Sequence, residues 1–238
     1  MSSTSTTPES ATIDCSERAV RLINQEVRAA FASGIGRVTL SNPGAKHNLG
    51  VALPEGVHLT IDGSAGYYAA GLNDGATVEI RGSAGWGAAE SMRVGTVLID
   101  GDAGNAVAAS IRDGLVVVRG DASTRAGIAM KGGALIIGGS VGPMAAFMMQ
   151  KGIMIVCGDA GDGVADSMYA GTVYVAGSTG ELGADAIDAE FTEQDRELVY
   201  GHLERSKVPA PARFRKLIAG QKLWNFRQED LHLWKAAL

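Results

Sequence analysis

The segments of this chain most suggestive of chemistry are short and rich in glycine. GSAGWG at positions 82–87 resembles the turn that holds the pyrophosphate of a dinucleotide, but that turn must open a helix, and no helical pattern follows here. GDAGDGVAD at positions 158–166 resembles calcium-binding repeats, which need aspartate to recur in a nine-residue period that is absent here. Neither segment predicts a cofactor or a metal.

Histidine, cysteine and the polar turn residues do not form a catalytic set either. No two of the four histidines have metal-ligand spacing, so we expect surface or capping roles for His47, His58, His202 and His232. Cys15 and Cys157 lie far apart, which fits a reducing compartment and argues against both a disulfide scaffold and zinc. Ser64, Asp102, Asp121, Ser140 and Asp159 follow glycines as turn residues. We therefore expect no catalytic, cofactor-binding or metal-binding residue in this chain.

Composition narrows the class of protein further. The 238 residues carry a formal charge of -5, which gives no reason to expect nucleic acid or anionic lipid as a partner. The polar start MSSTSTTPES is not a signal peptide, and glycine, Pro143 and Lys151 interrupt the apolar stretch 134–156, which argues against a membrane span. We expect a cytoplasmic protein. Its 33 glycines are about twice the usual share.

Those glycines follow a strict 19-residue period. One series, here called the ladder glycines, consists of Gly44, Gly63, Gly82, Gly101, Gly120, Gly139, Gly158 and Gly177. A second series closes the repeats at Gly75, Gly95, Gly114, Gly133, Gly152 and Gly171. Self-similarity at such a period indicates a stack of short units that cannot bury their apolar faces alone.

Each repeat contains two apolar columns that predict a strand. Four residues before the ladder glycines stand Leu59, Val78, Val97, Val116, Leu135, Met154 and Val173, and two before them stand Ile61, Ile80, Ile99, Val118, Ile137, Val156 and Val175. The residues between vary, which is the alternation of a strand with one buried face. The residue just before the ladder glycine runs Asp62, Arg81, Asp100, Arg119, and opposite charges on consecutive units favour in-register stacking.

The rest of each repeat returns the chain to the next strand. A helical return would give a leucine-rich-repeat horseshoe, but this segment holds several glycines and small residues, and glycine costs about 1 kcal/mol in a helix. Strand segments joined by glycine turns, where glycine accepts positive φ, fit better. We predict an all-β fold, a right-handed parallel β-helix of about seven or eight coils with a packed interior.

Non-repetitive segments flank the predicted β-helix of residues 37–190. We expect a disordered lead over residues 1–11 and an amphipathic helix over 12–36, with Asp14 and Glu17 as a capping box and Val20, Ile23, Val27 and Phe31 on one face. Residues 191–238 form a tail, with a helix to about Arg205, a proline-rich link and an apolar-basic end. We expect part of this tail to cap the last coil.

One outward-facing column turns apolar for five coils. It runs Thr60, Glu79, Leu98, Val117, Ile136, Ile155 and Tyr174. Two explanations remain open: a terminal helix of the same chain covers this wall, or a partner protein binds it. The aromatic tail poses the same choice. The candidate partner-interface residues are Leu98, Val117, Ile136, Ile155, Tyr174, Trp224, Phe226 and Trp234.

Repeated segments such as GSAGYY, GSAGWG, GDAGNA and GDAGDG, followed by small residues and a closing glycine, resemble the GXGXG β-helix family. That family includes the C-terminal domain of the glutamate synthase large subunit and the C subunit of formylmethanofuran dehydrogenase and related formyltransferase/hydrolase complexes. The resemblance covers about residues 37–190. A free-standing domain with an N-terminal helix and a tail containing KLIAGQKLWNF resembles the small β-helix subunits of N-methylglutamate synthases, in which three chains share the parts of glutamate synthase.

The resemblance implies a bridging scaffold between an amidotransferase-like subunit and an FMN and iron-sulfur synthase subunit, which binds both cofactors. The whole complex would convert methylamine and glutamate to N-methylglutamate and ammonia, and no catalytic residue transfers to this chain. One alternative is the β-helix subunit of a formyl-transfer complex. Another is a polysaccharide-active β-helix enzyme, although such enzymes usually present carboxylates and aromatics on a wall that is aliphatic here.

Overall fold

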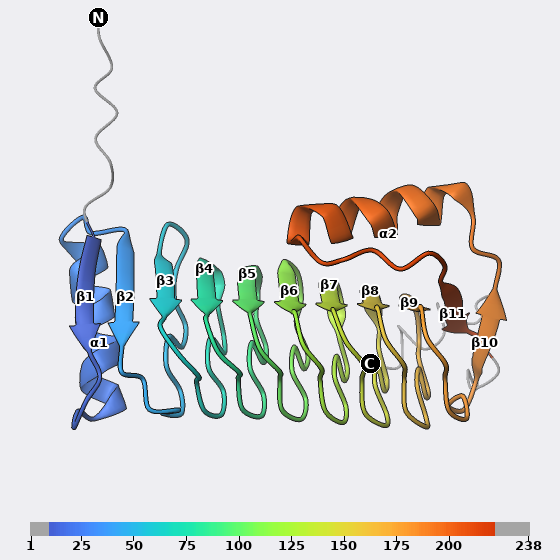
Figure 1. Cartoon of the computed structure of the whole chain (residues 1–238), viewed down its shortest axis with the longest axis horizontal. Helices are drawn as coiled ribbons and strands as arrows, with labels where there is room; N and C mark the ends of the chain where they lie inside the picture. Colours follow the sequence, from blue (N-terminus) through green and yellow to red (C-terminus); the bar gives the residue numbers. More distant parts are fainter. Residues whose placement is uncertain (1–9, 222–238) are drawn as a thin grey trace, which may run out of the picture.

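The protein is a parallel β-solenoid, shown by a computed structural model that describes residues 10–221 (Figure 1). Its strands belong to one sheet of order β1-β2-β3-β4-β5-β6-β7-β8-β9-β11-β10. The elements are β1 (Ser10–Asp14), α1 (Val20–Ala32), β2 (Arg37–Ser41), β3 (His58–Ile61), β4 (Asp74–Ile80), β5 (Val94–Ile99), β6 (Leu115–Val118), β7 (Lys131–Ile137), β8 (Lys151–Val156), β9 (Thr172–Val175), β10 (Ala186–Ala189), α2 (Glu193–Ser206) and β11 (Arg215–Ala219). No helix among these elements is long and apolar enough to cross a bilayer.

Residues nineteen apart are stacked neighbours, as the sequence predicts. In the parallel pairs from β3 to β9, Leu59 lies opposite Val78, Val78 opposite Val97, and so on to Met154 opposite Val173. A second line of parallel bridges joins Ala65, Ala84, Ala103, Ala122, Val141, Ala160 and Thr179. The parallel β-solenoid prediction is therefore confirmed.

The interior is closely filled by the two strand columns and by small or flexible residues of the return segment. The column from Leu59 to Val173 and the column from Ile61 to Val175 are both buried. The same core cluster contains buried alanines such as Ala89 and Ala108, and buried methionines such as Met92 and Met130. The unbranched methionines can fill irregular space between the walls, so the solenoid has a packed core.

The ladder glycines are needed for close contact between coils more than for backbone conformation. A Cβ built on Gly158 would lie 2.7 Å from the carbonyl carbon of Gly139 and 2.8 Å from its oxygen. The closing glycines instead adopt positive φ, as at Gly114 (+89°). Our expectation that glycine supplies positive φ at the turns therefore holds for the closing series, while most ladder glycines are required because any side chain would strike the coil beneath.

The return segment differs from the expected pair of strands. Beyond the single bridge position it is a run of turns in which ordinary residues adopt positive φ, as at Tyr68 (58°), Ala70 (55°) and Leu72 (56°). Backbone hydrogen bonds to neighbouring coils hold these turns, for example Tyr68 N–H to the Trp86 carbonyl at 2.7 Å and Ala70 N–H to the Leu49 carbonyl at 2.9 Å. Inter-coil bonding thus compensates for a conformation that non-glycine residues otherwise disfavour.

At the N-terminal end, the structure corrects the predicted start of the helix. Residues Ser10–Asp14, partly assigned to a disordered lead, form β1 and pair in parallel with β2. Asp14 does not cap α1; its carboxylate accepts hydrogen bonds from the backbone N–H and hydroxyl of Ser16, and α1 begins at Val20 without a side-chain cap. Ile23 and Val27 face the core as predicted. The capping-box signal failed because Asp14 belongs to a strand.

At the C-terminal end, the chain covers its own last repeat. β11 inserts between β9 and β10 and is antiparallel to both. It therefore satisfies the backbone groups that the edge of β9 would otherwise leave free. The predicted helix to about Arg205 is α2, which ends at Ser206 and lies along the long axis of the solenoid over β6 to β9 (Figure 1).

Candidate functional surface

The acidic residues that follow the ladder glycines serve the stack itself. Asp102 Oδ1 accepts the backbone N–H of Asp121 (2.9 Å), and Asp121 Oδ1 accepts that of Ser140 (2.7 Å). Asp159 Oδ1 accepts the N–H of Ser178 (2.6 Å), and this bond holds the pKa of Asp159 below its usual value. These carboxylates act as inter-coil acceptors, which is a structural role.

The histidines and cysteines do not gather in the described part of the chain. Residues 10–221 contain no group of three or more His, Cys, Asp or Glu that could hold a metal ion. Cys15 is buried, and burial raises the pKa of Cys157 to about 11. The pKa of His202 is lowered mainly by burial, and the positive charge of the nearby Arg205 lowers it further. His58 is exposed at the start of β3, and His232 lies outside the described residues.

An exposed aromatic stack lies at one corner of the first coils, and sequence analysis missed it. The rings of His47 and Tyr67 are 4.4 Å apart, and those of Tyr67 and Trp86 are 5.1 Å apart, each pair within 16° of parallel. His47 Nδ1 also accepts the N–H of Tyr67 (2.8 Å). Trp86 remains 53% exposed. The signal was present, since Tyr67 and Trp86 are nineteen residues apart.

The apolar outer wall is covered by the same chain. Val117, Ile136, Ile155 and Tyr174 are buried and form a cluster with residues of α2 and of the link that follows it: Val199, Leu203, Val208 and Phe214. Leu98 is half-buried at the margin of this cluster. Of the two explanations left open, the structure shows the first. We therefore correct the partner-interface assignment for these four buried residues, because α2 occupies the surface a partner would need.

The sequence of α2 explains why it forms and which face it buries. Thr192 and Asp195 make a capping box: the Thr192 hydroxyl accepts the Asp195 N–H, and the Asp195 carboxylate accepts the Thr192 N–H. This supplies partners for two backbone N–H groups at the start of the helix. Asp195, Val199, Leu203 and Ser206 are the buried residues of α2, and their spacing places them on one face toward the wall. The Thr-x-x-Asp pattern was the signal for this start.

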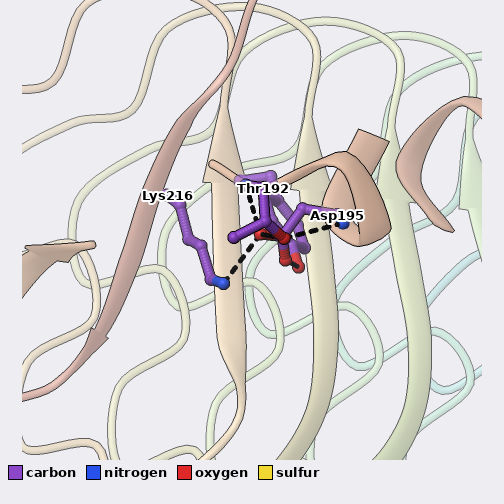
Figure 2. A network of polar contacts seen from close by, with 4 residues as sticks. Thr192, Asp195 and Lys216 are labelled. Atoms are coloured by element: carbon purple, nitrogen blue, oxygen red, sulfur yellow. Dashed lines mark hydrogen bonds and ion pairs between the residues drawn. The ribbon is translucent and has the colours of Figure 1, made fainter. Parts of the chain in front are cut away.

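A polar network fastens α2 to two strands (Figure 2). The Asp195 carboxylate accepts hydrogen bonds from the Tyr174 hydroxyl on β9 (2.6 Å) and from Lys216 Nζ on β11 (2.8 Å), in addition to Thr192. Burial favours the neutral acid, but the bonds from Lys216, Tyr174 and Thr192 outweigh it and hold the pKa of Asp195 well below its usual range. Burial and the bond to Asp195 raise the pKa of Tyr174. The network joins three segments at one buried charge.

Replacing Asp195 by asparagine is expected to loosen α2 selectively. The amide keeps the shape but leaves the Lys216 ammonium half-buried without its counter-charge, which we expect to cost about 2 kcal/mol. Because the folded-state pKa of Asp195 is lowered, its contribution is present above the unfolded value of 3.8 and is lost as pH falls below it. Hydrogen exchange of α2 amides should accelerate in the variant, with β4 amides as the internal control. Unchanged α2 protection would contradict this role.

Trp224, Phe226 and Trp234 lie outside residues 10–221. Their assignment to a partner interface stays a prediction.

Together, these features define a protein class: a β-solenoid in which regular coils are held by inter-coil ladders and one wall carries the chain's own helix. The model of the GXGXG motif family matches residues 10–200, which includes β1, the whole solenoid and the first half of α2. The chain therefore belongs to the GXGXG motif family. No curated protein matches it.

Proposed function

We propose that this chain is a structural subunit of a glutamate-synthase-like complex, in the manner of N-methylglutamate synthase. In that assembly it bridges an amidotransferase-like subunit and an FMN and iron-sulfur synthase subunit and shapes the path of the amine. The complex would convert methylamine and glutamate to N-methylglutamate and ammonia. The observation that carries the proposal is the match of the GXGXG family to a solenoid that makes up most of the chain. A cytoplasmic location is part of the same proposal.

The chain's own residues support leaving the iron-sulfur cluster to a partner. Such clusters are usually held by four cysteine thiolates, and this sequence has two cysteines. Cys15 is buried in the core next to β1, and the Cys157 thiol has a raised pKa that disfavours the thiolate ligand form. A cluster in the complex would therefore need ligands from another subunit.

The structure also suggests how a solenoid can serve as a rigid spacer. Each coil bonds to the next through two lines of parallel backbone pairs and through the Asp and Ser side-chain ladder. With about 4.8 Å per coil, the seven strands β3 to β9 extend roughly 30 Å. Such a length can hold two bound proteins at a fixed separation.

Affinity purification of the full chain from its native host, followed by mass spectrometry, tests this proposal. We expect an amidotransferase-like chain and an FMN-dependent synthase chain to co-purify, while the isolated polypeptide is colourless and inactive. Recovery with subunits of a formyl-transfer complex would instead support the formylmethanofuran dehydrogenase alternative. Flavin absorbance that stays with the isolated polypeptide would refute a purely structural role.

A second candidate, polysaccharide binding, is favoured by one observation, the exposed stack of His47, Tyr67 and Trp86. Exposed rings of this kind can pack against sugar faces. If this candidate holds, Trp86→Ala should abolish retardation of the protein in gels that contain polysaccharide. Equal migration of the wild type with and without polysaccharide would eliminate it.

A further inference from the structure

A column of exposed positive charge follows the corner where the return segment ends. Arg112, Lys131 and Lys151 occupy three consecutive coils, are exposed, and form no ion pair within residues 10–221. Lys131 and Lys151 lie directly opposite each other in the β7–β8 pair. Asp113, next to Arg112, accepts the Gly114 N–H (2.7 Å) and forms no ion pair with any described residue. We call Arg112, Lys131 and Lys151 the basic column.

Such stacking is unfavourable for the isolated chain. Like charges directly opposite on neighbouring strands destabilise a sheet. Elsewhere the same solenoid stacks opposite charges, and the pairs form: Arg81 reaches Asp62 at 3.3 Å and Arg119 reaches Asp100 at 3.0 Å. The basic column also stands in a protein whose formal charge is -5. An external anionic partner would explain why these three cations have no ion-pair partner among residues 10–221.

An apolar strip runs beside the basic column. Two or three residues before Lys131 and Lys151 stand Ala129 and Met148, and Met148 is 37% exposed; the corresponding residue before Arg112 is the polar Ser110. Backbone bonds from Ser110 N–H to the Ile128 carbonyl (2.8 Å) and from Ala129 N–H to the Phe147 carbonyl (2.8 Å) place these segments side by side. Ile128 and Phe147 are half-buried. On the next coil, Tyr169 donates its N–H to the Met149 carbonyl (2.8 Å), so it lies beside the Lys151 end of the basic column, and it is 48% exposed. Apolar surface bordered by cations suits an amphipathic acidic segment.

The spacing of the cations favours a helix lying along the solenoid axis. Consecutive coils are about 4.8 Å apart, so the basic column spans about 10 Å. Acidic residues at positions i, i+3 or i+4, and i+7 of a helix span the same length, at 1.5 Å per residue. A strand places same-face residues about 6.7 Å apart and fits less well. The chain itself provides a precedent, because α2 covers the other wall in this orientation (Figure 1).

We propose that the basic column and the apolar strip dock an acidic amphipathic helix of a partner subunit. This inference rests on the proposed function only in taking the helix from the synthase or amidotransferase chain. Charge would steer and orient the helix, and the apolar strip with Met148 would bury its aliphatic face.

The test compares two double variants of the full chain that change its net charge equally. Lys131→Glu with Lys151→Glu reverses two of the three charges of the basic column and is called the basic-column variant. Arg21→Glu with Arg37→Glu reverses two exposed cations on α1 and β2 that form no ion pair in the described structure. One binding partner is the co-expressed synthase or amidotransferase chain. A second probe is a synthetic 14-residue helical peptide with glutamates at the stated spacing beside a leucine stripe, with a lysine-substituted version as its control.

We expect the basic-column variant to bind the acidic peptide and one partner chain at least about tenfold more weakly than wild type at low salt, and the control variant to stay within about twofold. Equal losses in both variants, or equal binding of the acidic and basic peptides, would overturn the inference. If partner chains bind wild type and basic-column variant alike, the inference fails and the proposed function stands. If no partner chain binds wild type, the proposed function fails, and the peptide alone decides the inference.

Two other occupants are distinguishable in the same samples. A wild-type dimer in light scattering that becomes monomeric only in the basic-column variant would assign this surface to a second copy of the chain. Peptide binding that appears only after residues 222–238 are deleted would assign it to the chain's own C-terminal segment. Either result would overturn docking of a partner helix.

Discussion

Ile136→Glu is expected to detach α2 from the solenoid and to destabilise the protein by about 4 kcal/mol or more. Ile136 is fully buried beneath α2, so the carboxylate would lose its hydration without gaining a partner. The column beneath it, including the inward-facing Leu135, is untouched, and repeats of a solenoid contact only their neighbours. We therefore expect α2 to unfold or swing away while most coils persist. Denaturant unfolding and hydrogen exchange of α2 amides measure both effects.

The matched control is Thr39→Glu on β2. Thr39 occupies the same outward column, opposite Thr12 and Thr60, and α2 does not reach it. Its substitution should cost less than about 1 kcal/mol, as for most partly exposed sites. Equal destabilisation by the two variants would show that the burial of Ile136 under α2 does not hold in solution.

Gly158→Ala is expected to destabilise the stack by about 3 kcal/mol, although alanine has the better strand and helix propensity. The new methyl group would lie 2.7–2.8 Å from the backbone of Gly139, and the backbone can yield only by separating the coils. Gly158 does not have positive φ, so the loss would come from contact between coils and not from conformational strain. The free energy of unfolding in denaturant is the measurement.

Gly36→Ala serves as its control. A Cβ at Gly36 would meet only the Gly56 carbonyl oxygen at 3.5 Å, which is ordinary contact, and its φ is also not positive. This variant should stay within about 1 kcal/mol of wild type. A Gly158 variant as stable as the Gly36 variant would contradict the close inter-coil approach.

The repeat made the fold highly predictable from the sequence. Because each coil has the same length, the apolar columns beginning at Leu59 and Ile61 specify both the strand and its stacking partner. The reason for the ladder glycines was less accessible, since the distance from Gly158 to Gly139 depends on how closely coils approach. The turns at Tyr68 and Leu72 were also missed, because ordinary residues hold positive φ there through hydrogen bonds between coils.

The terminal segments lack this repetition, and prediction was weaker there. Asp14 and Glu17 matched a capping box, yet Asp14 ends a strand that pairs with a partner 27 residues away. From the sequence, the wall that contains Ile136 could be covered either by a terminal helix of the same chain or by a partner protein. Choosing between them required the position of α2. The Lys216 to Asp195 contact joins segments whose proximity no local pattern encodes. The apolar wall thus indicated that a helix or a partner protein covers it, but did not indicate which of the two.

The most direct test of the proposed bridging role is the rate of N-methylglutamate formation by the two proposed partner chains with and without this chain. We expect the amidotransferase-like and synthase chains together to form N-methylglutamate from methylamine and glutamate only when this chain completes the assembly, and this chain alone to form none. Full activity of the two partners in its absence would contradict the account, as would turnover by this chain alone.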